Sequence, residues 1–271
     1  MNLTALLGGV AWGGYWDLMR KYHRFEVRGL EHILNHRGPA LIVGYHGKPG
    51  ARDLIMLQTQ LLREHGMVTH AVTHDMMLRL PFVRSAALGM QLIGRDPASI
   101  EAAVKRKEKL VVTPGGIEEA WGSFRDRYTV KWRRRLGYLK LAIEHKLPII
   151  PVGAVGVDDA FYGLYNAYEI WKPLWDRYGL PVGTGVWIGF GPLGAWPFTP
   201  PFPSRIIQYV DPPIDLAKEG LKDTKDPEKL LGFHNYLAAR VQQILDHARK
   251  QLRARAVEEE MEELTCLNPV L

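Results

Sequence analysis

Residues 39–66, PALIVGYHGKPGARDLIMLQTQLLREHG, decide the fold. Their first eight residues form a nearly continuous apolar run, which is typical of a strand buried on both faces of a sheet. Apolar residues then recur at helical spacing, with Asp53 placed as an N-cap and Gly66 as a stop. A buried strand followed by a helix of this kind predicts one unit of an α/β fold.

The same alternation continues along the chain. Further strands are expected in RFEVRGL (24–30), VTHAVTH (68–74), LVVT (110–113), LPIIPVGAVG (147–156) and RIIQYV (205–210), and further helices in SIEAAVKRKEK (99–109, capped by Ser99) and RLGYLKLAIEHK (135–146). Residues 162–203 are rich in Trp, Gly and Pro and are expected to form loops with at most one strand. The fold class is therefore α/β, with a central, mostly parallel sheet flanked by helices.

A single domain is expected over residues 1–271, because no repeat and no sharp linker interrupts the pattern. Within it, residues 25–216 form the core and residues 227–264 a long C-terminal helix. The apolar stripe of that helix consists of Leu237, Val241, Ile244 or Leu245, Ala248 and Leu252.

The N-terminal segment 1–24 is apolar for about fourteen residues and then becomes basic at Arg20, Lys21 and Arg24. Two interpretations remain open: an amphipathic helix lying at a membrane surface, or a helix packed on the core of the domain itself. No apolar run reaches the roughly 18–20 residues that span a bilayer, so peripheral or monotopic attachment is expected.

Composition limits the function classes. The formal net charge is +6, but no zinc-finger or RNP-like motif is present, so no nucleic-acid partner is expected. Cys266 is the single cysteine, which excludes an internal disulfide and fits a reducing cytoplasm. His70 and His74 are four residues apart, but they fall in an alternating β-branched segment, so no metal site is expected.

Three segments contain residues suited to chemistry. His46 follows a buried strand and Asp53 begins a helix, so the pair forms either a general base with its orienting carboxylate or a turn histidine with a helix cap. Gly115 and Gly116 also follow a strand, where backbone N–H groups can approach an anion. The candidate substrate-binding residues are Arg95, Gly115, Gly116, Glu118, Glu119 and Arg134, the last from a run of three arginines at 133–135.

The sequence lacks the motifs of two common enzyme classes. No G-x-S-x-G nucleophile elbow is present, which argues against an ordinary α/β-hydrolase. The glycines of VGAVGVDDAFYG (152–163) lack the strand, G-x-G-x-x-G and helix order of a dinucleotide site.

Six segments, in this order, resemble the His/Asp-motif superfamily of glycerolipid and lysophospholipid acyltransferases. They are FEVRGLEHI, LIVGYHGKPGARD, LGMQLIGRD, LVVTPGGIEEAW, LPIIPVGAVG and RIIQYVDPPIDL, which together extend over residues 25–216. The fourth of these segments, LVVTPGGIEEAW, is most similar to the PGG-x-RE-A version found in the monoacylglycerol and diacylglycerol acyltransferase branch. Two features depart from the family: six residues separate His46 from Asp53, where four or five are usual, and Glu118 stands where the branch often has arginine.

The resemblance implies a membrane-associated O-acyltransferase that uses no cofactor. The fatty acyl group would pass from acyl-CoA, as co-substrate, or from acyl carrier protein to the hydroxyl of a lysophospholipid or an acylglycerol at the cytoplasmic face of a membrane. His46 would be the general base and Asp53 its orienter, with backbone N–H groups near Gly115 and Gly116 at the oxyanion. A lipid esterase or thioesterase and a catalytically inactive lipid-binding protein remain as alternatives.

Overall fold

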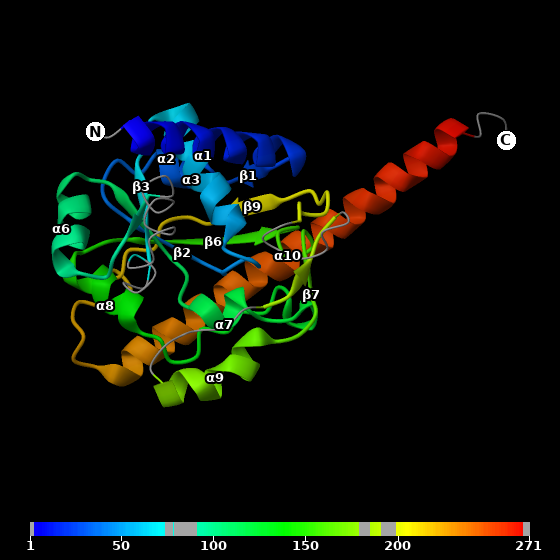
Figure 1. The fold of residues 1–271 in the computed structure, drawn as a ribbon. Coiled ribbons are helices and arrows are strands. Elements are labelled where there is room, and N and C mark those ends of the chain that lie inside the picture. Colours follow the sequence, from blue (N-terminus) through cyan, green and yellow to red (C-terminus); the bar gives the residue numbers. More distant parts are fainter. Residues whose placement is uncertain (1–2, 74–77, 79–90, 179–184, 191–198, 268–271) are drawn as a thin grey trace.

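The computed structural model describes residues 3–73, 78, 91–178, 185–190 and 199–267 (Figure 1). Its centre is a seven-stranded sheet with the strand order β1-β9-β6-β2-β5-β3-β4. The strands are β1 (Glu26–Arg28), β2 (Leu41–Gly44), β3 (Thr69–Val72), β4 (Leu92–Ile93), β5 (Lys109–Val112), β6 (Ile149–Val155) and β9 (Ile207–Val210). Every neighbouring pair is parallel except β6 and β9, which confirms the mostly parallel sheet expected from the sequence.

Helices lie on both faces of this sheet (Figure 1). They are α1 (Leu3–Tyr22), α2 (Glu31–Leu34), α3 (Arg52–His65), α6 (Pro97–Lys105), α7 (Gly116–Ala120), α8 (Gly137–Glu144), α9 (Ala167–Tyr178) and α10 (Pro227–Leu267). The side chains of β2 show why the strand is apolar throughout. Leu41 and Val43 belong to the core cluster formed with α6, α8 and α10, whereas Ile42 belongs to the cluster formed with α2 and α3.

Helix α10 packs along β6 through the apolar stripe expected from its sequence. Leu237, Val241, Leu245 and Ala248 are buried. A Cβ atom on Gly153 of β6 would lie 3.1 Å from side-chain carbons of both Ile244 and Leu245, so glycine lets the helix approach the strand closely. Beyond the sheet, the C-terminal part of α10 extends away from the body of the molecule (Figure 1).

Helix α1 confirms the expected N-terminal helix, and its two sides differ. Trp16 and Met19 are buried, and the guanidinium of Arg52 lies 5.5 Å from the centre of the Trp16 ring. Tyr15, Leu18 and Tyr22 are exposed on the same helix. Among the helices that the structure describes, none is long and apolar enough to cross a membrane.

Two local expectations were wrong. Helix α6 begins after Asp96, whose carboxylate accepts a hydrogen bond from Ser99 N at 2.9 Å, so Asp96 and not Ser99 is its N-cap. Residues 162–203, expected to be loops with at most one strand, contain the helix α9 with Pro173 inside it. They also contain a two-stranded antiparallel sheet of β7 (Tyr162–Gly163) and β8 (Trp187–Ile188).

Of the two histidines expected on a strand, His70 and His74, the structure describes His70. His70 lies on β3, as predicted, with its Nε2 2.9 Å from Glu108 Oε2, whereas His74 lies outside the described residues.

Candidate active site

Three loops meet at one edge of the sheet, beyond the carboxyl ends of neighbouring strands. Strand β2 lies between β5 and β6 and is parallel to both. His46 follows β2, Gly115 and Gly116 follow β5, and Asp158 follows β6. Reactive groups in open α/β sheets gather at this edge, so the fold places the predicted motifs where chemistry is expected.

The loop after His46 contains a turn that accommodates its six intervening residues. Ala51 N donates to Gly47 O at 2.8 Å, and Gly50 and Ala51 both have left-handed backbones, with φ of 78° and 51°. Helix α3 then begins at Arg52 with Ala51 as its N-cap, so the prediction that Asp53 is the cap was wrong. Asp53 instead lies in the first turn of α3, where a Cβ atom on Gly47 would come within 2.6 Å of its Oδ1.

His46 is held in a form suited to act as a base. Its Nδ1 lies 3.1 Å from Gly47 O, a contact that places the proton on Nδ1 and leaves the lone pair on Nε2. Burial lowers the pKa of His46 to about 4, and the charge of Lys48 acts in the same direction. The imidazole is therefore neutral at pH 7, as a general base must be before it accepts a proton.

Asp53 lies close to this loop but does not bond to the imidazole. The carboxylate is buried, and neither of its oxygens forms a hydrogen bond of ordinary geometry with a described residue. Burial raises the pKa of Asp53 to about 7, the charge of Asp158 adds to the shift, and the N–H groups of Leu54 and Asp53 oppose it. Asp53 was expected to accept from one imidazole nitrogen, and here the partner of Nδ1 is Gly47 O, so the orienting role of Asp53 stays a prediction.

Glu119 connects the His46 loop to another segment of the chain. Its Oε2 accepts from His46 N at 2.9 Å and its Oε1 accepts from Lys131 N at 2.7 Å. A Cβ atom on Gly115 would lie 1.9 Å from the Glu119 side chain, so the glycine is required for this arrangement. Burial raises the pKa of Glu119 to about 8, although both hydrogen bonds oppose the shift. Its predicted contact with substrate stays a prediction, and both oxygens already have backbone partners.

Glu118 is paired with two residues of the arginine run. Arg133 donates to both of its carboxylate oxygens, at 2.7 and 2.8 Å, and Arg135 Nη2 donates to Oε2 at 2.8 Å. Arg135 Nη1 also donates to Gly115 O at 2.7 Å. The pair therefore fastens the glycine turn to the loop before α8, and Arg134 between them is exposed.

Two other candidate residues are less directly placed. Gly116 has a left-handed backbone with φ of 51°, and its N–H donates to Thr113 O at 2.9 Å, so contact with an oxyanion would require this bond to open. Arg95 follows β4 and is exposed. Because β4 is three strands from β2 in the sheet, about 14 Å at the usual strand spacing, the fold does not bring Arg95 next to His46.

Asp158 is a member of the site that the sequence analysis missed. Its carboxylate accepts from Tyr45 OH at 2.7 Å, from Lys48 N at 2.9 Å and from Tyr128 N at 3.0 Å. The ammonium of the buried Lys48 lies 3.9 Å from it. Burial raises the pKa of Asp158, and Lys48 together with these hydrogen bonds opposes the shift. An acidic residue three positions after a fully buried strand was the feature in the sequence that could have identified it.

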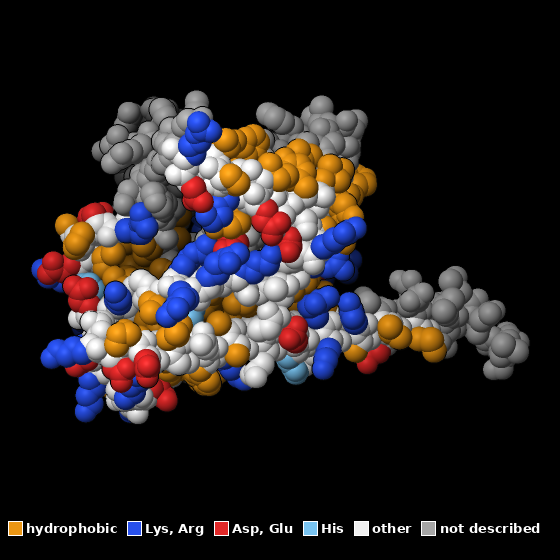
Figure 2. All heavy atoms as spheres, turned by 90° about the horizontal axis from the view of Figure 1, so that it is seen from below, with side chains coloured by type: hydrophobic (Ala, Val, Ile, Leu, Met, Phe, Trp, Pro, Cys, Tyr) orange, Lys and Arg blue, Asp and Glu red, His pale blue; other side chains and the backbone are white. Residues whose placement is uncertain are grey.

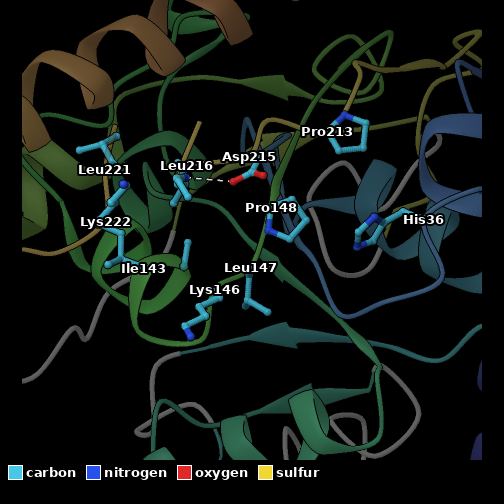
Figure 3. Close-up of a pocket in the computed structure, with 12 residues that line it drawn as sticks. His36, Ile143, Lys146, Leu147, Pro148, Pro213, Asp215, Leu216, Leu221 and Lys222 are labelled. Atoms are coloured by element: carbon cyan, nitrogen blue, oxygen red, sulfur yellow. Dashed lines mark hydrogen bonds between the residues drawn. The ribbon is translucent and has the colours of Figure 1, made fainter. Parts of the chain in front are cut away.

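A cavity of about 600 Å³ lies at the opposite edge of the sheet, where β6 begins (Figure 3). Leu147, Pro148, Leu216 and Leu221 are among its lining residues, with His36, Lys146 and Lys222 also around it. None of the candidate catalytic or substrate-binding residues lines this cavity.

Comparison with known proteins identifies the family. The profile of the diacylglycerol acyltransferase family matches residues 43–178, which is half of the chain and runs from β2 to the end of α9. The chain belongs to the diacylglycerol acyltransferase family. The matched segment includes His46, Asp53, Glu119 and Asp158.

Several curated proteins are similar in sequence to this chain. A chicken protein named as a DGAT1/2-independent enzyme synthesizing storage lipids is 28% identical over 195 residues, covering 72% of this chain and 53% of that protein. The bovine protein of the same name is 26% identical over 216 residues, covering 78% of this chain and 59% of the bovine protein. This chain thus spans between half and two thirds of the length of these relatives. Phytyl ester synthase 2 of Arabidopsis thaliana is 27% identical over 238 residues, which are 82% of this chain and 34% of that protein.

A solved structure supports the fold. The 1-acyl-sn-glycerophosphate acyltransferase PlsC from Thermotoga maritima aligns with a TM-score of 0.53 and 14% identity, covering 89% of this chain and 79% of that one. At this identity the likeness concerns the α/β architecture alone.

Proposed function

We propose that the protein is a membrane-associated O-acyltransferase that moves a fatty acyl group from a thioester donor, acyl-CoA or acyl carrier protein, to the hydroxyl of a glycerolipid. The observation that carries the proposal is the state of His46 within the family-matched segment. A neutral imidazole whose Nδ1 bonds to Gly47 O presents the Nε2 lone pair to a hydroxyl.

The reaction needs no covalent acyl-enzyme. Nε2 of His46 accepts the proton of the acceptor hydroxyl as its oxygen attacks the thioester carbonyl, and the thiolate that leaves takes the proton back from the imidazolium. General-base assistance of this kind contributes about 10²–10⁴-fold to the rate. A backbone N–H at the Gly115 turn is the proposed donor to the oxyanion that forms in the transition state.

An uncharged acceptor, a mono- or diacylglycerol, agrees better with the charges than a lysophospholipid does. Glu118 is already bonded to Arg133 and Arg135. A phosphorylated headgroup recruited by these two arginines would have to compete with that carboxylate. Arg95, the other candidate for a phosphate, lies on the far side of β5 and β3 from β2.

Attachment at the cytoplasmic face of a membrane is proposed through α1. The exposed residues Tyr15, Leu18 and Tyr22 offer apolar and aromatic surface, and Arg20 and Lys21 lie in the last turn of the helix. Each basic residue near an anionic surface contributes about 1 kcal/mol, so vesicle binding should weaken as salt is added.

The test is transfer from radiolabelled palmitoyl-CoA to a panel of acylglycerols and lysophospholipids on vesicles, with His46→Ala assayed beside the wild type. Labelled lipid that disappears in the folded variant supports the proposal and identifies the acceptor. Release of CoA without labelled lipid would instead indicate a thioesterase. Lipid binding with no turnover would indicate a catalytically inactive binding protein.

A further inference from the structure

The small sheet of β7 and β8 has one buried face and one exposed face. Tyr162 pairs with Ile188 and Gly163 with Trp187. Since side chains alternate along a strand, Phe161, Gly163 and Trp187 share the inner face, and all three are buried. The outer face is formed by Tyr162, Leu164, Val186, Ile188 and Phe190.

Every residue of this outer face is apolar or aromatic. Leu164 is 52% exposed, Phe190 is 60% exposed and Tyr162 is 45% exposed, whereas Trp187 on the inner face is 2% exposed. An antiparallel sheet that faces water on one side normally alternates apolar residues inward with polar residues outward. Contiguous apolar residues at all the outward positions therefore indicate a surface that meets something other than water.

This outer face is connected to the candidate active site through one short segment. The rings of Tyr162 and Phe124 are 4.4 Å apart between centroids. The residue before Phe124, Ser123, accepts a hydrogen bond through its carbonyl from Lys48 Nζ at 3.3 Å. Lys48 is two residues after His46, so the outer face lies beside the loop that carries the proposed base.

Cations border the aromatic part of this face. The guanidinium of Arg127 lies 3.8 Å from the centre of the Phe124 ring, and its Nε lies 3.7 Å from Asp159 Oδ1. Arg125 is exposed one residue after Phe124. Aromatic and aliphatic side chains bordered by arginines are typical of a surface that enters the headgroup region of a bilayer. Figure 2, which views the molecule from the side of α9, shows hydrophobic side chains gathered in patches beside Lys and Arg.

We propose that the outer face of the β7–β8 sheet is a second membrane-docking surface, separate from α1, that inserts into the lipid bilayer beside the His46 loop. This inference rests on the proposed function and specifies how a water-insoluble acceptor reaches the base: it enters from the bilayer without crossing bulk water. Apolar side chains supply the insertion, and the bordering arginines contact the phosphates of the lipid headgroups.

The test compares two double variants of the full chain. Leu164→Ser with Phe190→Ser removes the two most exposed side chains of the outer face. Tyr236→Ser with Val257→Ser, both on α10 and similarly exposed, is the matched control. Flotation with vesicles of phosphatidylcholine and phosphatidylserine in a four to one ratio measures binding. Thermal melting and circular dichroism confirm that each variant folds.

The outer-face variant is expected to lose about tenfold or more in vesicle binding, while the α10 variant binds like the wild type. The outer-face variant is expected to transfer the acyl group to a short-chain, water-soluble acylglycerol at the wild-type rate. Wild-type vesicle binding by a folded outer-face variant overturns the inference. A change in its oligomeric state without a loss of vesicle binding overturns it too, because that result would assign the face to contact with a second copy of the chain. If the wild type transfers no acyl group at all, the proposed function fails while flotation still decides whether this face binds lipid.

Discussion

The two edges of the central sheet differ in what they bury. At the carboxyl edge, Asp53, Glu119 and Asp158 are buried together with Lys48, and they surround the loop of His46. At the amino edge a cavity of about 600 Å³ is open, and its charged lining residues, Lys146, Asp215 and Lys222, are exposed (Figure 3). Burying charged groups costs free energy that a fold retains chiefly where function requires it. The comparison teaches that a cluster of buried carboxyl groups, and not the size of a cavity, distinguishes the edge at which the chemistry is proposed to occur.

The largest contrast is expected between two histidines, one at each edge. His46→Ala should reduce acyl transfer by about 10²–10⁴-fold, because it removes the proposed general base. His36→Ala, which removes a side chain that contacts Pro39 O at 3.2 Å beside the amino-edge cavity, should leave the rate near that of the wild type. Steady-state transfer assays on both folded variants measure the difference. Equal rates in the two variants would refute the assignment of the base.

The second contrast concerns two lysines. Lys48→Met leaves the buried carboxylate of Asp158 without its counter-ion, and breaking a buried pair in this way costs about 3–5 kcal/mol. Lys222→Met, at the exposed rim of the amino-edge cavity, should change the free energy of unfolding by no more than about 0.5 kcal/mol. Urea denaturation monitored by tryptophan fluorescence distinguishes the two, and a stable Lys48 variant would show that Asp158 is neutral in the folded protein.

The third contrast uses two carboxylates that bond to backbone N–H groups. Above about pH 8, where Glu119 is ionised, both of its oxygens accept; Glu119→Gln offers one acceptor and one donor to the same two backbone N–H groups, so His46 N or Lys131 N loses its partner. The expected cost is about 1–3 kcal/mol in stability, accompanied by a lower kcat because the His46 backbone is no longer held. Asp215→Asn keeps an acceptor for Ala217 N, 2.9 Å away in an exposed turn, and should behave like the wild type.

The smallest effect is expected at Asp53 and depends on pH. Because burial raises its pKa from 3.8 to about 7, the folded protein binds this proton more tightly than the unfolded chain does. Its contribution to the free energy of unfolding is therefore full below pH 3.8 and is lost as the pH rises through 7. In the Asp53→Asn variant the side chain does not ionise, so the stability lost at high pH in the wild type is retained. The Tm of the variant should therefore exceed that of the wild type by on the order of a few °C at pH 8 and by less at pH 5. A Tm difference that is independent of pH would mean that Asp53 does not titrate in this range.

Local sequence patterns predicted most of the sheet and much less of the site. The strand at β2 could be identified because both of its faces are buried, which makes the run continuous in sequence. Helix α9 was missed because Trp, Pro and Gly dominate its surroundings, although Pro173 is tolerated within it. The start of α3 was misplaced because the left-handed backbone at Ala51, which is neither Gly nor Asn, cannot be anticipated from residue type.

The functions of the acidic residues depend on tertiary contacts. Asp158 becomes part of the site only because β6 lies next to β2, so that the loops after the two strands meet. Glu119 was expected to face substrate, yet its partners are N–H groups 73 and 12 residues away along the chain. Residue type and spacing could therefore locate the blocks of the site, but they could not tell a residue that contacts substrate from one that holds a loop in place.

The pairing of β1 with β9 also dictates the order in which the molecule can be completed. Glu26 lies opposite Ile207, and the side chains of Arg28 and Tyr209 that bond across this pair are 181 residues apart in the chain. During synthesis β1 leaves the ribosome well before its partner β9, because the paired residues Arg28 and Tyr209 are 181 residues apart in the chain. Until β9 is available, β6 lacks its neighbour on the β9 side. Strand β1, which follows α1, has no strand with which to pair. Closure of this edge is therefore expected to be a late, slow step of folding, since contacts so distant in sequence carry a large loop-closure entropy.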